Sequence, residues 1–214
     1  MPTIVLPTAY LPSVAYMVSL VQNTSAVIDI HEHYIKQTCR NRCNVASANG
    51  VLPLIVPVHK TAGNHTPVRD IEVSSLQRWQ SNHWRAIESA YSSSPYYLYY
   101  KDELRPFYQR IYTDLAGMNR EILMCLGKLL GISIRLCFSE EFIVPDSAGA
   151  DLRRNKNLFT PGAVRLEPYQ QVFLQKFGFI PNLSILDLLF NLGPESKNYL
   201  DRQSVSITSV KPVP

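Results

Sequence analysis

Lys36, Arg40 and Arg42 lie close together in residues 36–42, which read Lys-Gln-Thr-Cys-Arg-Asn-Arg. We expect this segment to lie within a β-strand over residues 35–45, so that Arg40 and Arg42 share one face, about 7 Å apart. Guanidinium groups bind phosphates and carboxylates through paired hydrogen bonds. The spacing therefore predicts a site for an anion, with Lys36 nearby. A strand face exposed to water is the alternative.

A histidine lies on the apolar arc of a helix that we expect over residues 74–91. With 100° between residues, His83 falls between Trp79 and Ile87, whereas Arg85 and Glu88 fall on the polar arc. A buried imidazole is unfavourable unless its nitrogens are paired. We therefore expect His83 to be buried with a hydrogen-bond partner, either in the core or in a pocket wall.

A second helix, expected over residues 182–192, is apolar around most of its circumference. Ser184, Asp187 and Asn191 share one arc of it, and this arc carries no Lys or Glu. Short polar groups on such a helix indicate a pocket wall or a buried network. The alternative is a narrow surface stripe in which Asn182 and Ser184 cap the helix.

Signatures of known catalytic sites are missing from the sequence, which has no GxSxG, P-loop, GxGxxG or HExxH motif. A zinc site could be formed by His31, His33, Cys39 and Cys43. Four ligands within thirteen residues would, however, require a very tight turn of the chain. We therefore expect no metal, and the sequence names no cofactor. The cysteine spacing favours reduced thiols in a cytoplasmic protein.

The composition describes a globular protein, with 46% hydrophobic and 18% charged residues among 214. These values exclude disorder, collagen and coiled coil. A net charge of +4 is too mild to imply nucleic acid. No Lys or Arg precedes the apolar N-terminal stretch, which prolines interrupt, so we expect no signal peptide and no membrane span. We expect one domain over residues 1–202 and a flexible tail over 203–214.

The spacing of apolar residues predicts the strands and helices that position these candidate site residues. A strand over residues 3–7, a helix over 14–21 and a strand over 26–30 predict a parallel βαβ unit. Asn49-Gly50 predicts a hairpin between residues 35–45 and 51–58. Further helices are expected over 74–91, after Ser94-Pro95, and over 114–130, 168–177, 182–192 and 194–201, with a strand over 132–138. The predicted fold class is α/β: a mostly parallel, Rossmann-like layered sheet with a helical C-terminal portion.

A long segment with few apolar residues, 145–165, carries Arg153 and Lys156. Unstructured loops of this length in compact domains are usually lids or binding loops. We expect a mobile segment that becomes ordered when a ligand binds.

Several motifs resemble the WbqC-like protein family. They are the Tyr10-Leu11-Pro12 region, HEHYIKQTCRNRC at 31–43, HWRAIESAY at 83–91, YQQVF at 169–173 and GFIPNLSILDLLFNLGPES at 178–196. Many members open with a His-Gln-Pro-Asn pattern, where this chain has Leu-Pro-Thr-Ala at residues 6–9. The resemblance implies a role in bacterial O-antigen and surface polysaccharide synthesis, by transfer of an amino acid such as glycine, or a similar acyl group, to a sugar.

These arguments predict a cytoplasmic transferase-like enzyme that acts on a nucleotide-linked or phosphorylated sugar. His83 or Asp187 would be the general base, and Asn182 and Asn191 would orient the substrate. The predicted substrate-binding residues are Tyr10, Lys36, Arg40, Asn41, Arg42, Arg85, Glu88, Arg153, Asn182, Ser184 and Asn191. One alternative is a non-catalytic sugar- or nucleotide-binding or scaffold protein of polysaccharide assembly. Another is a nucleic-acid-binding protein, which the dispersed charge does not favour.

Overall fold

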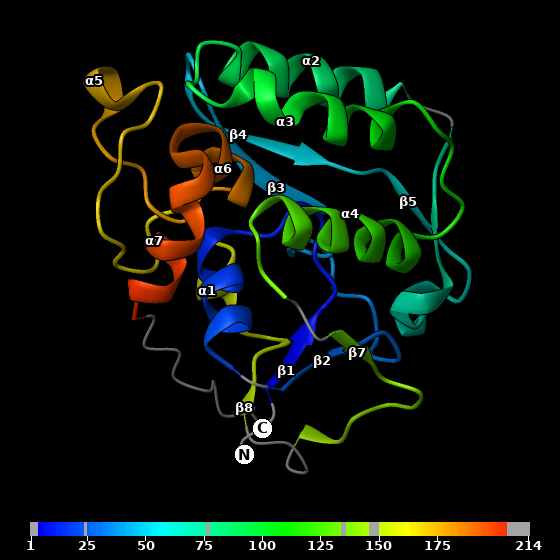
Figure 1. Cartoon of the computed structure of the whole chain (residues 1–214). Coiled ribbons are helices and arrows are strands. Elements are labelled where there is room, and N and C mark those ends of the chain that lie inside the picture. Colours follow the sequence, from blue (N-terminus) through cyan, green and yellow to red (C-terminus); the bar gives the residue numbers. More distant parts are fainter. Residues whose placement is uncertain (1–3, 24, 76–77, 134–135, 146–149, 205–214) are drawn as a thin grey trace.

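A four-stranded parallel sheet lies at the centre of the fold (Figure 1). The computed structural model describes residues 4–23, 25–75, 78–133, 136–145 and 150–204. The strand order is β7 (Leu136–Phe138), β2 (Ala26–Asp29), β1 (Ile4–Pro7) and β8 (Ala150–Asp151). Taken in chain order, these strands lie 3-2-1-4, as in a Rossmann-like sheet. The predicted α/β class and the parallel βαβ unit are confirmed.

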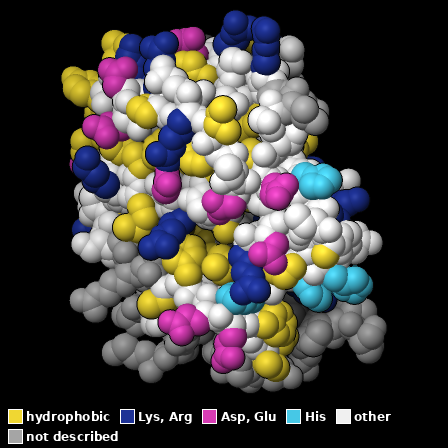
Figure 2. All heavy atoms as spheres, turned by 90° about the vertical axis from the view of Figure 1, so that its right-hand side faces the viewer, with side chains coloured by type: hydrophobic (Ala, Val, Ile, Leu, Met, Phe, Trp, Pro, Cys, Tyr) yellow, Lys and Arg dark blue, Asp and Glu magenta, His cyan; other side chains and the backbone are white. Residues whose placement is uncertain are grey.

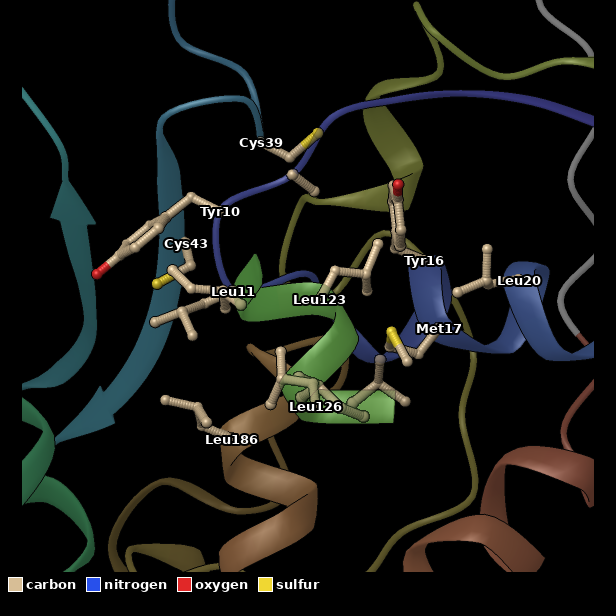
Figure 3. Close-up of a cluster of buried hydrophobic side chains, with 14 of the residues drawn as sticks. Tyr10, Leu11, Tyr16, Met17, Leu20, Cys39, Cys43, Leu123, Leu126 and Leu186 are labelled. Atoms are coloured by element: carbon tan, nitrogen blue, oxygen red, sulfur yellow. The ribbon is translucent and has the colours of Figure 1, made fainter. Parts of the chain in front are cut away.

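Helix α1 (Val14–Gln22) connects β1 to β2. All four residues of β1 are buried, as expected for a strand covered on both faces. The α1 helix begins after Ser13, whose side chain accepts a hydrogen bond from the amide of Tyr16. Figure 3 shows Tyr16, Met17 and Leu20 of this helix in the same buried cluster as Leu123 and Leu126. This packing fixes the loop that joins β1 to α1.

Two hairpins extend beside the sheet: β3 (Arg42–Ser47) with β4 (Gly50–Ile55), and β5 (Val58–Lys60) with β6 (Ile71–Val73). The turn at Asn49-Gly50 is confirmed, and Gly50 has the positive φ of 101° that the turn requires. The predicted strand over residues 35–41 is wrong, because pairing begins only at Arg42. Arg40 and Arg42 therefore do not share a strand face.

Helices α2 (Trp79–Tyr91) and α3 (Tyr97–Leu104) lie together beside the β3–β4 hairpin, and α4 (Leu115–Leu129) lies nearer the sheet (Figure 1). The predicted start of α2 at Ser74 is wrong. The amide of Ser74 bonds to the carbonyl of Pro57, so the backbone there still follows β6. The side chain of Asp114 caps α4 by accepting a hydrogen bond from the amide of Gly117, and the helix ends before Gly131, which has a φ of 65°.

The C-terminal portion is helical, with α5 (Leu174–Phe177), α6 (Ile185–Leu192) and α7 (Ser196–Arg202). The predicted helix over 168–177 forms only in its last turn, because Tyr169 and Gln171 direct their side chains to Asp187. Gln203, placed in the expected tail, is buried and bonds to Glu167. The tail beyond residue 204 lies outside the described residues. In the part of the chain that the structure describes, no helix is long and apolar enough to span a bilayer.

The predicted lid over residues 145–165 is wrong for the part that the structure describes. Residues 150–151 form β8, and the amide of Leu152 bonds to the carbonyl of Val5 in β1. Leu152, Arg153, Asn155 and Leu158 are all buried. The segment belongs to the sheet and the core, although it has few apolar residues. Residues 146–149 lie outside the described ranges.

Candidate functional site: a cationic pocket beside the parallel sheet

A pocket of about 390 Å³ opens beside the loop that follows β1. Its walls come from residues 10–13, 35–39, 42–44 and 156–161, and from Asn182 and Ser184 before α6. The β1 and β8 strands are neighbours, and the chain leaves their carboxyl ends toward this pocket. In sheets with this strand order, ligands bind where the connections diverge, next to these ends. The volume lies within the range of small-molecule sites.

Every charged side chain in the pocket wall is cationic: Lys36, Arg42 and Lys156. Asp, Glu and His do not occur among the residues that line it. The structure gives these three side chains no hydrogen-bond or ion-pair partner among the described residues, and the Nε atom of Arg42 is buried without one. Three unpaired cations around one cavity attract an anion, and a low local dielectric strengthens this attraction.

Two neutral polar side chains, those of Asn182 and Ser184, stabilise the pocket wall. Asn182, at a φ of 63°, accepts from the amide of Ala15 at 2.9 Å and donates to the carbonyls of Asn157 and Thr160. Ser184 caps α6 and donates to the carbonyl of Leu11 at 3.1 Å. These two side chains are therefore occupied by structural hydrogen bonds, whereas the three cations and the exposed amide of Gln37 are available to a ligand.

The amides at the start of α6 are also occupied. The amide of Ser184 bonds to the carbonyl of Asn44, and the amide of Ile185 bonds to the carbonyl of Pro12, both at 2.7 Å. Helix N-termini often bind anions through such groups. Here those donors connect the loop after β1 and the β3 strand to α6, so they shape the pocket.

Arg40, predicted to bind the ligand, does not line the pocket. It is fully buried, and its guanidinium donates to both carboxylate oxygens of Glu32 at 2.6 Å. Burial raises the pKa of Glu32 to about 7, against the lowering effect of Arg40. Asn41 is also buried and donates to the carbonyl of Val56.

Arg153 does not line the pocket either. It forms ion pairs with Asp29, the last residue of β2, and with Asp151, the last residue of β8. The side chain of Asp29 is completely buried, and it also accepts from Ser139 and from the amide of His31. This network joins the carboxyl ends of β2 and β8, the strands on either side of β1, so Arg153 supports the end of the sheet beside which the pocket opens.

His83 is buried and hydrogen-bonded, as its position on the apolar arc predicts. Its Nδ1 atom lies 2.9 Å from the hydroxyl of Tyr10, and its ring packs edge-on against Trp79 at 5.2 Å. Burial lowers the pKa of His83 from 6.5 to about 4, while a backbone hydrogen bond with Ile55 acts in the opposite direction. The histidine is therefore neutral at pH 7. It does not line the pocket, but Tyr10 does.

Asp187 is fully buried and does not line the pocket. One of its oxygens accepts from the hydroxyl of Tyr169 and from the amide of Gln171, both at 2.7 Å. Burial raises its pKa from 3.8 to about 6, and hydrogen bonds, with Tyr169 first, lower it. Asn191 donates to the backbone carbonyl of Asp187, so the polar arc of α6 forms a buried network.

Two further predicted residues, Arg85 and Glu88, are exposed on α2 away from the pocket wall. Sequence reasoning missed Phe159, which forms a half-buried apolar part of the wall. Cys39 and Cys43 also line the pocket, but burial raises the pKa of both thiols, that of Cys39 to about 12. Both are therefore protonated and unreactive at neutral pH. Within the described ranges, no group of three or more His, Cys, Asp and Glu is placed to hold a metal ion.

A larger cavity, of about 530 Å³, lies among residues 163–168 and 202–204. The charged residues that line it have both signs: Arg165 and Arg202 are basic, and Glu167 is acidic. On the molecular face in Figure 2, basic and acidic side chains are similarly interspersed. The smaller pocket differs because its charge has a single sign, and we therefore take it as the candidate site.

The fold and the pocket define an α/β protein with a cavity lined by cationic side chains beside a Rossmann-like sheet. The model of the WbqC-like protein family matches residues 8–158, and the chain belongs to this family. The match includes all three pocket cations. Uncharacterized protein Rv1507c of Mycobacterium tuberculosis is 29% identical over 196 residues, covering 78% of this chain and 83% of the relative. No solved structure matches the chain significantly.

Proposed function

We propose that the protein is a cytoplasmic, transferase-like enzyme of bacterial polysaccharide synthesis that binds a nucleotide-linked sugar in the cationic pocket. The observation that carries the proposal is the group of three unpaired cations, Lys36, Arg42 and Lys156, around a cavity of about 390 Å³. A diphosphate carries the negative charge that such a cavity favours. Phe159 offers an apolar surface for a base or sugar ring.

The proposed reaction moves an amino-acid or other acyl group to the sugar. The attacking amine or hydroxyl must lose a proton, and the pocket wall holds no carboxylate or imidazole to accept it. A base outside the wall is the neutral His83, whose Nδ1 atom lies 2.9 Å from the hydroxyl of the pocket-lining residue Tyr10. In this proposal the Tyr10 hydroxyl transmits the proton to His83, and Asp187 has no catalytic role.

A second candidate function is binding without turnover, as in a scaffold protein of polysaccharide assembly. The specific observation in its favour is the same shortage of acid–base groups in the wall. Both candidates require the ligand to be an anion, and they differ only in whether a product forms.

Calorimetric titration with UDP-glucose and with inorganic pyrophosphate tests the shared part of the proposal. Arg42→Gln should weaken the binding of both ligands by about ten- to a hundredfold, because a charge-assisted contact contributes about 1.5–3 kcal/mol. Arg105→Gln is the matched control, since Arg105 is exposed and does not line the pocket. Equal affinity of wild type and Arg42→Gln would contradict the site.

Turnover distinguishes the two candidates. The protein is incubated with a UDP-linked amino sugar and a glycine thioester. Mass spectrometry then measures the molecular mass of the nucleotide sugar. An enzyme adds one glycyl group to the sugar and releases the thiol. Tight binding with no mass change for this or any other acyl thioester would favour the scaffold function.

A further inference from the structure

Arg40 lies behind the pocket, where its guanidinium meets three separate segments of the chain. Its Nε and Nη2 atoms donate to Glu32, at 2.9 Å and 2.6 Å, in the segment that follows β2. Its Nη1 atom donates to the hydroxyl of Thr38 at 2.9 Å, and its Nη2 atom donates to the carbonyl of Arg153 at 3.1 Å. The side chain is completely shielded from water.

Two of these contacts involve chain segments that form parts of the pocket wall. Thr38 belongs to the wall of residues 35–39, which carries Lys36. Arg153 leads into the wall of residues 156–161, which carries Lys156. We infer that Arg40 is a positioning residue, whose paired hydrogen bonds to Glu32 and further bonds to Thr38 and Arg153 fix the spacing of the two cationic walls. This inference rests on the proposed function of the pocket.

The neighbouring backbone supports the same role. The carbonyl of Arg40 accepts from the side chain of Asn119 in α4 at 2.8 Å, and the carbonyl of Cys39 accepts from the amide of Tyr10 at 2.9 Å. Arg40 is therefore fixed to the core on one side, while its guanidinium reaches both walls on the other.

An ion pair is an unusual way to stabilise a core, because both charges must be removed from water. An apolar pair of similar volume often stabilises a fold equally well. Unlike an apolar side chain, the planar guanidinium directs hydrogen-bond donors at fixed angles to several acceptors. The two parts of the pocket wall that carry Lys36 and Lys156 repel each other, so hydrogen bonds at fixed angles are needed to hold them in place. The carboxylate of Glu32 compensates the buried charge of Arg40.

The test replaces the pair by apolar residues, in the double variant Glu32→Leu with Arg40→Met. No unpaired buried charge is left, so the melting temperature should stay near that of the wild type. Hydrogen–deuterium exchange should rise together in residues 31–41 and 152–161, by about tenfold or more. Pyrophosphate binding should weaken by about tenfold, because the cations are no longer held in position.

Thr38→Val gives a second measurement that does not disturb the ion pair. It removes the hydroxyl that accepts from Arg40 and donates to the carbonyl of Ile35 at 2.7 Å, and it leaves the contact of Arg40 with Arg153 in place. Exchange should therefore rise in residues 35–39 and not in 152–161. A folded double variant with unchanged exchange in either segment would overturn the inference. If the wild type does not bind pyrophosphate or UDP-glucose, the proposed function fails, and the exchange data still decide whether Arg40 restrains both segments.

Discussion

The hydroxyl of Tyr10 lies 2.9 Å from the Nδ1 atom of His83, although 73 positions separate the two residues in the chain. A second hydroxyl, from Tyr108, lies 3.1 Å from that of Tyr10. Tyr10 belongs to the loop after β1, His83 to α2, and Tyr108 to the 3₁₀ turn after α3. Figure 3 shows Tyr10 beside Cys43 and Leu11, at one end of the buried cluster. One hydroxyl therefore connects the pocket loop to the helices beside the β3–β4 hairpin.

Removing this hydroxyl should destabilise the fold. Tyr10→Phe leaves a buried nitrogen of His83 and the hydroxyl of Tyr108 without their common partner. We expect a loss of about 1–3 kcal/mol in the free energy of unfolding, measured by urea denaturation. Tyr99→Phe is the control, because Tyr99 is 77% exposed, and it should change stability by less than about 0.5 kcal/mol. Equal effects of the two substitutions would contradict the buried contact.

His83 should make the protein sensitive to acid. Its pKa falls from 6.5 to about 4 in the folded state, so the unfolded chain binds more protons between these two pH values. Stability should therefore decrease as the pH falls through this window and level off below pH 4, with a total change of at most about 3 kcal/mol. The measurement is the free energy of unfolding from pH 7 to pH 4.

Other buried acids titrate in the same range, so the contribution of His83 is the difference between wild type and His83→Gln. The glutamine stays neutral throughout the window, and this difference should shrink toward acidic pH. The exposed His59 provides the control substitution His59→Gln. A pH-independent difference between wild type and His83→Gln would show that the imidazole does not titrate as described.

Asp187 should have the opposite pH dependence. Its pKa rises from 3.8 to about 6 on folding, so its contribution is complete below pH 3.8 and is lost as the pH rises through 6. Relative to Asp187→Asn, the wild type should lose at most about 3 kcal/mol of stability between pH 4 and pH 7. Pyrophosphate affinity should be equal in both proteins, since Asp187 does not line the pocket. A binding defect without a stability change would instead place Asp187 in the site.

The parts of the fold that depend on local pattern could be predicted from the sequence. The βαβ unit follows from two short apolar strands around a helix with apolar residues at helical spacing, and the helix expected over residues 114–130 corresponds to α4. The two-residue strand β8 could not be predicted, because two residues show no periodicity. It forms because its backbone completes hydrogen bonds with β1.

The site was harder to predict than the fold, for a physical reason. A cation in the sequence can face a ligand or a carboxylate, and only tertiary structure decides between them. Arg40 forms an ion pair with Glu32, and Arg153 forms one with Asp29. Arg42 lies only two residues after Arg40, but it forms no ion pair among the described residues. The side chains of Tyr169 and Gln171 similarly decide that Asp187 is part of a buried network.

The remaining two pocket cations should act mainly through charge. Lys36 and Lys156 are both exposed at the pocket rim, so salt partly screens their attraction for an anion. We expect Lys36→Gln and Lys156→Gln each to weaken pyrophosphate binding about three- to tenfold at low salt, and less at 0.5 M salt. Calorimetric titration at two salt concentrations measures both effects. Lys197→Gln is the control, because Lys197 is exposed on α7 and does not line the pocket. A salt-independent loss of affinity, or an equal loss in the Lys197 variant, would contradict a site that recognises its ligand by charge.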